Sequence, residues 1–486
     1  MPDEYVTVSR AGRWSPERLS PRWRRRSHSV WRHTAFITVE LAMPSSHPLP
    51  PSCHWFSALA AALDPRSAPR LAWLFVGALL ARGRRTVTSW VRAAGLSDEY
   101  RPCYTTVAAA GNRPDRIAAR LLREVVKPLI GDTDRLTFAL DDTPTERYGP
   151  KVQGAGVHHN PAPGPAGGPF VYGHVWVVLG LLARHSTWGI VALPLLARLY
   201  VRQKNLPGIA PEHRPEFRTK LELAVELVRW AVSWLGRLGK PVWVVADGAY
   251  AKAPFLKPIR ALAVTVVSRL RKDSALWTVP GPRAPHQRGP NRIYGEQRID
   301  LAKRAGQTRG WTTGTFDLYG KPAEKKYKTF VATWRPAGGA IRVVLVDEPK
   351  GWVAFFCTDT AATVADILGC VADRFSLEIT FRDVKEVVGA GQQQVRFVRA
   401  NVGAFHICLW TFTMTEAWAW KRDEKELAGH RSASPWDDVA RRPSHADKRR
   451  AWRQELLGNE IQAVLRLGVT EQELKAVAER MLNLAA

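Results

Sequence analysis

Three acidic residues lie far apart in the sequence, each at a position where a carboxylate could do chemistry. Asp142 follows the β-prone run 136–140, Asp247 closes the apolar run 241–246, and Glu378 lies within a predicted helix. Carboxylates brought together repel one another unless a cation neutralises them, and hard oxygen ligands suit Mg²⁺. Two such ions, about 4 Å apart, can hold the attacking and leaving oxygens of a phosphoryl displacement. The three acids therefore indicate a candidate two-metal site.

Each acid also has an ordinary structural explanation. The run Asp-Asp-Thr-Pro at 141–144 is typical of a turn or helix cap. Asp247-Gly248 is a common way to leave a strand, and Glu378 fits an exposed helix face. It is the order of the acids relative to the predicted elements that favours the catalytic interpretation.

The elements that must position these acids predict an α/β core. Hydrophobic patterning predicts strands at 136–140, 171–183, 188–196, 241–247 and 263–270, with an amphipathic helix at 214–236 and a second helix before the last strand. A further strand at 352–358 and a helix at 360–388 follow a Gly- and Pro-rich stretch. The order β-β-β-α-β-α-β is typical of a sheet with mixed strand direction.

These patterns divide the chain into six regions. We expect a basic, disordered arm at 1–50 (translation starting at Met1 or Met43), a helical DNA-binding region at 51–130, the first part of the core at 131–270, a basic β-rich insertion at 271–345, the second part of the core at 346–402, and a helical region at 403–486. The insertion holds 15 Lys/Arg against five Asp/Glu. Tryptophans at 410, 418, 420, 436 and 452 favour helix packing in the last region.

The charge of the chain indicates an anionic partner. Lys and Arg number 71 against 44 Asp and Glu, a formal net charge of +27, which suits nucleic acid or an acidic membrane surface. No basic amphipathic helix dominates, so the membrane surface is the weaker alternative. Five cysteines without a CxxC pair favour a reducing compartment. Without an apolar signal segment at the start, we expect a bacterial cytoplasm or nucleoid.

Two basic segments are candidates for DNA contact. Arg84 and Arg85 precede Thr86 in a pair of short predicted helices, a pattern similar to a helix-turn-helix; a basic bundle packed on the core remains the alternative. Lys151 lies in the Gly-rich stretch that follows the first acid, ahead of a His-His pair at 158–159. A His-His pair alone is not a metal site, so DNA contact is the function we consider for this stretch.

Three motifs in this sequence resemble those of DDE insertion-sequence transposases. They are Leu140-Asp141-Asp142-Thr143, Val245-Ala246-Asp247-Gly248 and Arg374…Glu378…Lys385. The resemblance is closest to the insertion-sequence-four-like group, which has a β insertion before the glutamate and the signature Tyr, two residues, Arg, three residues, Glu, six residues, Lys. Arg374 and Lys385 match the offsets around Glu378, whereas Val371 stands at the tyrosine position.

Two competing alignments remain open. Arg382 stands four before Glu386, but Gln393 stands where the lysine would be, so we favour Glu378. Asp141 competes with Asp142; neighbours in a strand face opposite ways, so only one should bind metal, and we favour Asp142 because Thr143 follows it. The gaps between the acids (247 − 142 = 105 and 378 − 247 = 131) leave room for the insertion.

The resemblance implies an RNase H-like mixed sheet flanked by helices and interrupted by the β insertion. It implies that Asp142, Asp247 and Glu378 hold two Mg²⁺ or Mn²⁺ ions and catalyse DNA cleavage at transposon ends, followed by strand transfer into target DNA. A homodimer would act on paired inverted-repeat ends. The alternatives are another RNase H-like nuclease, or a decayed or domesticated copy that binds DNA without cutting it.

The resemblance also implies phosphate contacts. Arg374 would bind phosphate as a bidentate fork and Lys385 as a point charge, with Arg382 in the same segment as a further DNA contact. Relatives can form a DNA hairpin with a flipped base, a step that Val371 weakens because valine donates no hydrogen bond to phosphate. Trp277, Trp311 and Trp334 in the insertion could stack on such a base.

Overall fold

The computed structural model describes residue 49 and residues 51–486, apart from 131–132, 161–166, 284–285, 287, 430–437, 439–440, 466–467, 469 and 486. The predicted arm, with Met43, lies outside the described residues except for Leu49, and Trp436 lies outside them as well. Residues His47–Ala486 form one compact unit. No helix among the described residues is long and apolar enough to cross a membrane.

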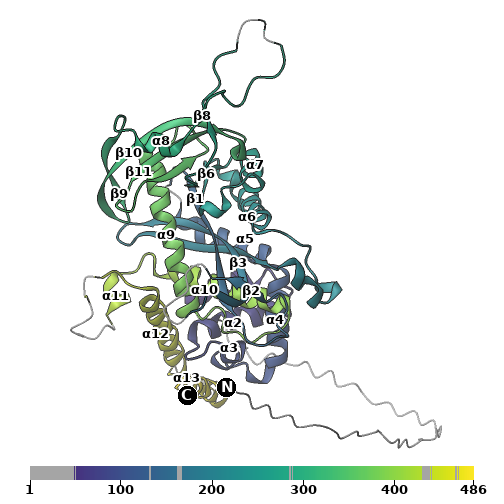
Figure 1. Cartoon of the computed structure of the whole chain (residues 1–486). Helices are drawn as coiled ribbons and strands as arrows, with labels where there is room; N and C mark the ends of the chain where they lie inside the picture. The colour runs from purple at the N-terminus through teal and green to yellow at the C-terminus, as the bar shows by residue number, and fades with distance from the viewer. Residues whose placement is uncertain are drawn as a thin grey trace, which may run out of the picture. The chain divides into compact units, whose positions relative to one another are not determined.

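One mixed sheet organises the chain (Figure 1). Its central strands β1 (Leu136–Glu146), β5 (Val242–Ala246) and β6 (Thr265–Leu270) are parallel, and β3 (Phe170–His185) and β4 (Gly189–Tyr200) continue it in antiparallel pairing. The short β2 (Gly156–His159) pairs with β3. Helices α6 (Lys220–Leu235) and α7 (Ala253–Ala261) occupy their predicted places in the chain. This is the RNase H-like α/β architecture that the sequence predicts.

The basic insertion extends the core sheet on its β6 side. Strand β12 (Val353–Cys357) pairs with β6, β11 (Gly339–Asp347) pairs with β12, and β10 (Lys321–Trp334) pairs with β11. The remaining elements are β7 (Leu276–Trp277), β8 (Arg298–Ile299), the short helix α8 (Leu301–Gly306) and β9 (Thr312–Leu318). The predicted β character is confirmed. Strand β11 crosses the boundary that we placed between 345 and 346.

Helix α9 (Val364–Glu386) runs along the sheet from β9 toward the helical part of the molecule (Figure 1). Thr363 and Asp366 form a capping box that fixes its start. Gly180 in β3 allows the helix to lie close, because a Cβ atom there would be 3.2 Å from Leu377 Cδ1. The small residue in β3 therefore leaves room for the Leu377 side chain of α9.

Helices from both ends of the described chain pack together beside the core. The first set is α1 (His54–Ala60), α2 (Ala68–Leu80), α3 (Val87–Ala93), α4 (Tyr100–Asn112), α5 (Pro114–Arg120) and a π-helical turn at Leu121–Val126. The second set is α10 (Val398–Ala419), α11 (Glu424–Ala428), α12 (His445–Val464) and α13 (Glu471–Ala485). Trp410 and Trp452 are fully buried, so the predicted packing role is confirmed for both.

Two buried contacts join these helices. Helices α4 and α10 cross at Gly111 and Gly403, where a Cβ atom on Gly403 would lie 1.8 Å from the Val107 carbonyl oxygen. Glu416 on α10 accepts from Lys448 (2.5 Å) and pairs with His445 (2.7 Å) on α12. The Lys448 ammonium is the main cause that lowers the Glu416 pKa to about 2, against the opposing effect of burial. Glu416 is therefore a paired buried charge that links α10 to α12.

We expect Gly403→Ala to destabilise the protein by about 3 kcal/mol, because the added methyl group forces α4 and α10 apart. Gly458→Ala in α12 is the matched control, since a Cβ atom there meets nothing within 4 Å. The control should be neutral or stabilising by up to about 1 kcal/mol, because alanine favours a helix. Chemical denaturation of both variants measures the difference; equal stabilities would contradict the close crossing.

Candidate active site

The first acidic pair lies inside a strand, which corrects the expectation that Asp142 ends one. Strand β1 continues to Glu146 because β3 pairs with it from Phe138 to Glu146, whereas its parallel pairing with β5 stops at Leu140. Pro144 is tolerated because that edge of β1 has no neighbouring strand beyond Leu140. The acids therefore lie where the parallel neighbour ends. Asp247 follows β5 directly, as predicted.

Asp141 faces helix α9. The Arg374 guanidinium donates to Asp141 Oδ2 at 2.5 Å and to Glu378 Oε1 at 2.9 Å. Arg374 and Glu378 stand one helical turn apart, so a single fork reaches both carboxylates. Arg374 therefore bridges the first and third acidic motifs in space.

Asp142 points to the opposite face of the sheet, as the alternation along a strand requires. It accepts from Lys220 Nζ at 2.6 Å, at the start of α6, and from the Tyr250 hydroxyl at 3.1 Å. His158 lies near this group, and burial, followed by the Lys220 charge, lowers the His158 pKa to about 4. Asp142 is thus separated from Glu378 by the sheet itself.

Asp247 belongs with Asp141. Leu140 and Ala246 are register partners in the parallel pair, so the following residues, Asp141 and Asp247, lie side by side. Burial raises the Asp141 pKa to about 6, with neighbouring Asp142 and Asp247 acting in the same direction and Arg374 opposing them. We call Asp141, Asp247 and Glu378 the α9-face acids.

The α9-face acids have oxygen donors of the kind that divalent metal ions bind, but as they lie they are not gathered into a metal-binding cluster. All three offer carboxylate oxygens, the ligands of Mg²⁺ and Mn²⁺, and the raised pKa of Asp141 reflects burial and crowding of negative charge. Within the described part of the chain, no three His, Cys, Asp or Glu residues are close enough to form a metal cluster. The Arg374 guanidinium provides the positive charge between Asp141 and Glu378.

The residues predicted to contact DNA lie in different environments. On α9, Arg382 is exposed and Lys385 is half-buried beside Glu146 and Glu386, with its pKa lowered by burial. Arg84 and Lys151 are exposed. These four side chains remain candidates for phosphate contact.

Arg85 is directed into the molecule. Its backbone N–H donates to Gln392 Oε1 at 2.8 Å, and its side chain lies against Gly389, at the C-terminal end of α9. Thr86 caps α3 as its sequence predicts, accepting from the Ser89 backbone at 3.1 Å. Arg85 therefore joins the helical region to the core, as in the bundle alternative.

The aromatic residues of the insertion also differ from one another. Trp334 is buried and packs on Phe356 with ring centroids 5.1 Å apart, so it is a core residue. Trp277 and Trp311 are half-buried, each with a cation over its ring. Sequence reasoning did not single out Tyr319 and Phe375, both exposed, whose rings lie 6.1 Å apart; Phe375 follows Arg374 in α9. The sequence features that could have drawn attention to them are the position of Tyr319 in the turn between β9 and β10 and the position of Phe375 directly after Arg374.

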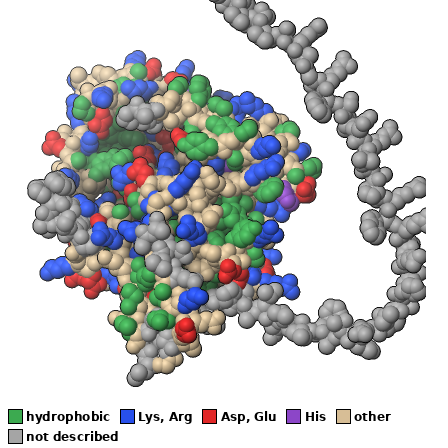
Figure 2. Space-filling view, turned by 90° about the horizontal axis from the view of Figure 1, so that it is seen from below, with side chains coloured by type: hydrophobic (Ala, Val, Ile, Leu, Met, Phe, Trp, Pro, Cys, Tyr) green, Lys and Arg blue, Asp and Glu red, His purple; other side chains and the backbone are tan. Residues whose placement is uncertain are grey.

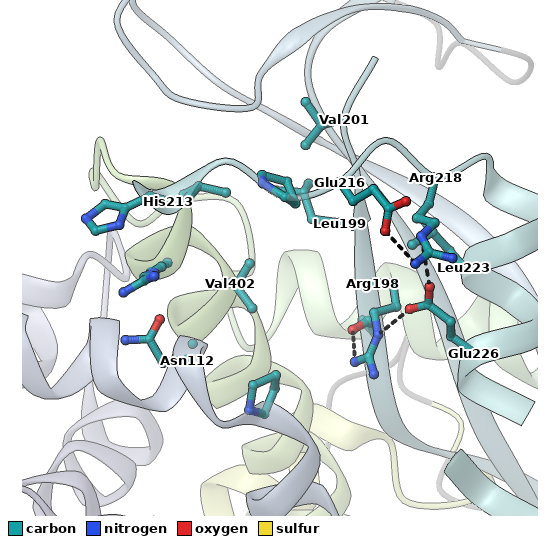
Figure 3. Close-up of a pocket in the computed structure, with 16 residues that line it drawn as sticks. Asn112, Arg198, Leu199, Val201, His213, Glu216, Arg218, Leu223, Glu226 and Val402 are labelled. Atoms are coloured by element: carbon teal, nitrogen blue, oxygen red, sulfur yellow. Dashed lines mark hydrogen bonds and ion pairs between the residues drawn. The ribbon is translucent and has the colours of Figure 1, made fainter. Parts of the chain in front are cut away.

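Figure 3 shows a pocket of about 390 Å³ between α4, β4, α6 and α10. Arg198 pairs with Glu226 (3.5 Å), and Arg218 pairs with Glu216 (2.7 Å) and Glu226 (3.6 Å). Asp142 on β1 and Arg198 on β4 both pair with Val177 of β3. The Arg198 side chain therefore lies on the same face of the sheet as Asp142. The carboxylates of this pocket are committed to arginines, so it fits packing of α6 better than metal chemistry.

An RNase H-like sheet that carries acids on neighbouring parallel strands is typical of a class of nucleases. The family model described as DDE superfamily endonuclease matches residues 59–321, more than half of the chain, and the chain belongs to this family. The match includes the acids of β1 and Asp247 and ends before Glu378. A comparison with curated proteins found no match. The family acts on DNA and generally uses divalent metals.

Tyr250 is a second residue that sequence reasoning missed. It lies in the 3-10 turn Gly248–Tyr250 directly after Asp247, is buried, and donates to Asp142. This hydrogen bond joins the turn after β5 to the middle of β1, and so sets the spacing of Asp141 and Asp247. An aromatic three residues after a strand-end acid was the available signal.

We expect Tyr250→Phe to lower the free energy of unfolding by about 2 kcal/mol, because the hydrogen bond from the buried Tyr250 side chain to the half-buried, charged Asp142 carboxylate is lost. Tyr104→Phe is the matched control: its hydroxyl bonds the exposed Thr88 hydroxyl at 2.9 Å, and its loss should cost less than about 1 kcal/mol. Urea titrations measure both. If the Tyr250→Phe protein were as stable as the control, the Tyr250–Asp142 hydrogen bond would not be stabilising in the way we propose.

Proposed function

We propose that this chain is a transposase of the insertion-sequence-four-like group. It would cut DNA at the inverted-repeat ends of a mobile element and join the freed 3′ ends to target DNA. The observation that carries the proposal is the Arg374 fork, which links Glu378 of the Arg-Glu-Lys spacing to Asp141 on β1. A spacing seen in sequence thus coincides with a contact between residues 233 positions apart.

We propose the α9-face acids as the catalytic carboxylates, with Asp141 in place of Asp142. Asp141 shares its face with Asp247 and Glu378, whereas Asp142 is held by Lys220 and Tyr250 on the other face. Asp142 then acts as a positioning residue. It holds β1 against the turn that follows Asp247, and through that turn it fixes the separation of the two catalytic aspartates.

The α9-face acids would hold two Mg²⁺ or Mn²⁺ ions. Such ions lower the pKa of a bound water and stabilise the charge that develops on phosphate oxygens. Arg374 keeps Glu378 directed toward β1 and offers a planar fork to phosphate. Lys385 supplies a point charge further along α9, and Arg382 an exposed one between them.

An extruded base would find aromatic surface beside Arg374. Trp334 is buried and unsuited to stacking, whereas Tyr319 and Phe375 are 68% and 46% exposed. Base stacking on an aromatic contributes about 1–3 kcal/mol. Val371 packs on the core and offers no hydrogen bond, so a hairpin step in this chain would depend on Tyr319, Phe375 and Arg374.

The partner that fits this surface is double-stranded DNA. Figure 2 shows Lys and Arg side chains spread over one face, with acidic side chains between them in small groups. Such a surface favours a polyanion along its whole length. A homodimer on paired ends, in a bacterial cytoplasm, completes the proposal.

Two other functions predict different behaviour. A domesticated, DNA-binding copy would bind without cutting, although Asp141, Asp247 and Glu378 are all present. A repair nuclease would cut branched DNA without regard to sequence. Cleavage confined to the inverted repeats that flank the reading frame would distinguish the transposase from both.

We expect Asp141→Asn and Asp247→Asn to lower Mn²⁺-dependent cleavage of an inverted-repeat duplex by at least about 100-fold, because each removes a metal ligand. Asp142→Asn is the matched control, with the same charge change one residue away. It should keep measurable cleavage at a temperature where melting shows it folded. If Asp142→Asn lowered cleavage more than Asp141→Asn, Asp142 would be the metal ligand instead.

Binding should be separable from cutting. We expect the logarithm of DNA affinity to fall linearly with the logarithm of salt concentration, because bound phosphates release counterions. Asp247→Asn should keep the wild-type affinity and slope, since the basic surface is unchanged. Fluorescence anisotropy between about 50 and 200 mM salt tests this; a flat response would argue against phosphate binding.

A further inference from the structure

A second cavity, of about 380 Å³, lies beside the strand that carries the first acids. It is lined by Arg84, residues 147–152 and residues 391–396, and we call it the Arg147 pocket. Four of its lining side chains are cations: Arg84, Arg147, Lys151 and Arg396. No carboxylate is among the residues that line it.

Arg147 is a buried charge without an acidic partner. It is 5% exposed, and no Asp or Glu of the described residues forms an ion pair with it. Its Nε donates to His174 Nδ1 at 3.1 Å, and its NH1 donates to the Gly391 carbonyl. The second terminal nitrogen, NH2, is buried and has no hydrogen-bond partner among the described residues.

The neighbours of Arg147 leave its charge uncompensated. His174 is neutral, because burial lowers its pKa to about 3 and the Arg147 charge acts in the same direction. The acid nearest in sequence, Glu146, points the other way along the strand and accepts from the Tyr148 hydroxyl at 3.0 Å. A buried guanidinium without an anion is costly, so the pocket suits an anionic ligand.

The rim of the pocket adds positive charge from three separate segments. Arg84 precedes α3, Lys151 follows β1, and Arg396 precedes α10; all three side chains are exposed. None of the three forms an ion pair with a described acid. A ligand that met all of them would be a chain of anions longer than a single small ion.

The pocket lies further along β1 from Asp141. Arg147 directly follows β1, six residues beyond Asp141 (147 − 141 = 6), which is roughly 20 Å of extended chain. Lys385 lies near Glu146, and Arg382 lies between Lys385 and Glu378 on α9. A row of basic side chains therefore leads from the proposed catalytic acids to the pocket. Twenty ångströms correspond to about six base pairs of B-DNA.

We propose that the Arg147 pocket binds a backbone phosphate of the DNA duplex, about six base pairs from the phosphate that is cut. Arg84 and Lys151 bind the phosphate and its neighbours from the rim, and the buried Arg147 charge beneath them attracts the anion. The contact sets the register of the duplex on the catalytic acids. The inference rests on the proposed function, since it takes the bound polymer to be the DNA that is cleaved.

The test compares two double variants with the same loss of charge. Arg84→Ala with Lys151→Ala removes rim cations. The control, Arg229→Ala with Lys350→Ala, removes two exposed cations from α6 and the β11–β12 turn. The probe is a 30-base-pair duplex carrying the flanking inverted repeat, in EDTA. We expect the rim variant to bind at least about 10-fold more weakly and to lose about two units of salt slope, with less than about a twofold effect in the control.

A third variant addresses Arg147 itself. Arg147→Met keeps much of the side-chain volume and removes the buried charge, so we expect an unchanged or raised melting temperature together with weaker duplex binding. If it does not fold, the rim variant still decides the question. Rim and control variants with equal affinity would overturn the pocket inference.

Two further outcomes are distinguishable. A wild-type protein that binds no duplex at all would refute the proposed function as well as the pocket. A wild-type protein that binds and cuts DNA, with the rim variant unimpaired, would refute the pocket alone. The pocket would then be a site for free phosphate if inorganic phosphate, at constant ionic strength, raised the melting temperature of wild type and not of Arg147→Met.

Discussion

The alternation of side chains along β1 decides which carboxylates can act together. Asp141 and Asp142 are neighbours, yet one meets Arg374 on α9 and the other meets Lys220 on α6. No rotamer carries a side chain through a hydrogen-bonded sheet. The composition of the site therefore depends on which face α9 covers, and on that face Gly180 leaves room for the Leu377 side chain.

The order of strands and the helix that carries Glu378 could be predicted from hydrophobic patterning and capping. The sequence could not show which of Asp141 and Asp142 faces α9, because their local sequences are equally polar and the face covered by α9 is set by residues more than 200 positions away. The length of β1 was underestimated for a related reason. Thr143-Pro144 is typical of a turn, but β3 continues to pair beyond it.

The charge composition predicts an anionic partner, but it does not identify which Lys and Arg side chains contact that partner. Arg85 packs against Gly389, and its predicted contact with DNA stays a prediction. Arg147 was not singled out, because a single arginine that follows an acid forms no recognisable motif. Its significance comes from burial without an acid, which only tertiary structure reveals. A net charge therefore indicates the class of partner, and burial shows which cations lack an acidic partner among the described residues.

Arg374 connects the stability of the metal-free site to its chemistry. Burial and neighbouring acids raise the Asp141 pKa, and the Arg374 guanidinium opposes that rise while also holding Glu378. In this way the fork keeps β1 and α9 together when no other cation neutralises the acids. Divalent ions that took over the neutralisation would release a planar donor pair matched to phosphate oxygens. Under the proposed function, one residue would then serve both the cohesion of the free site and its affinity for DNA.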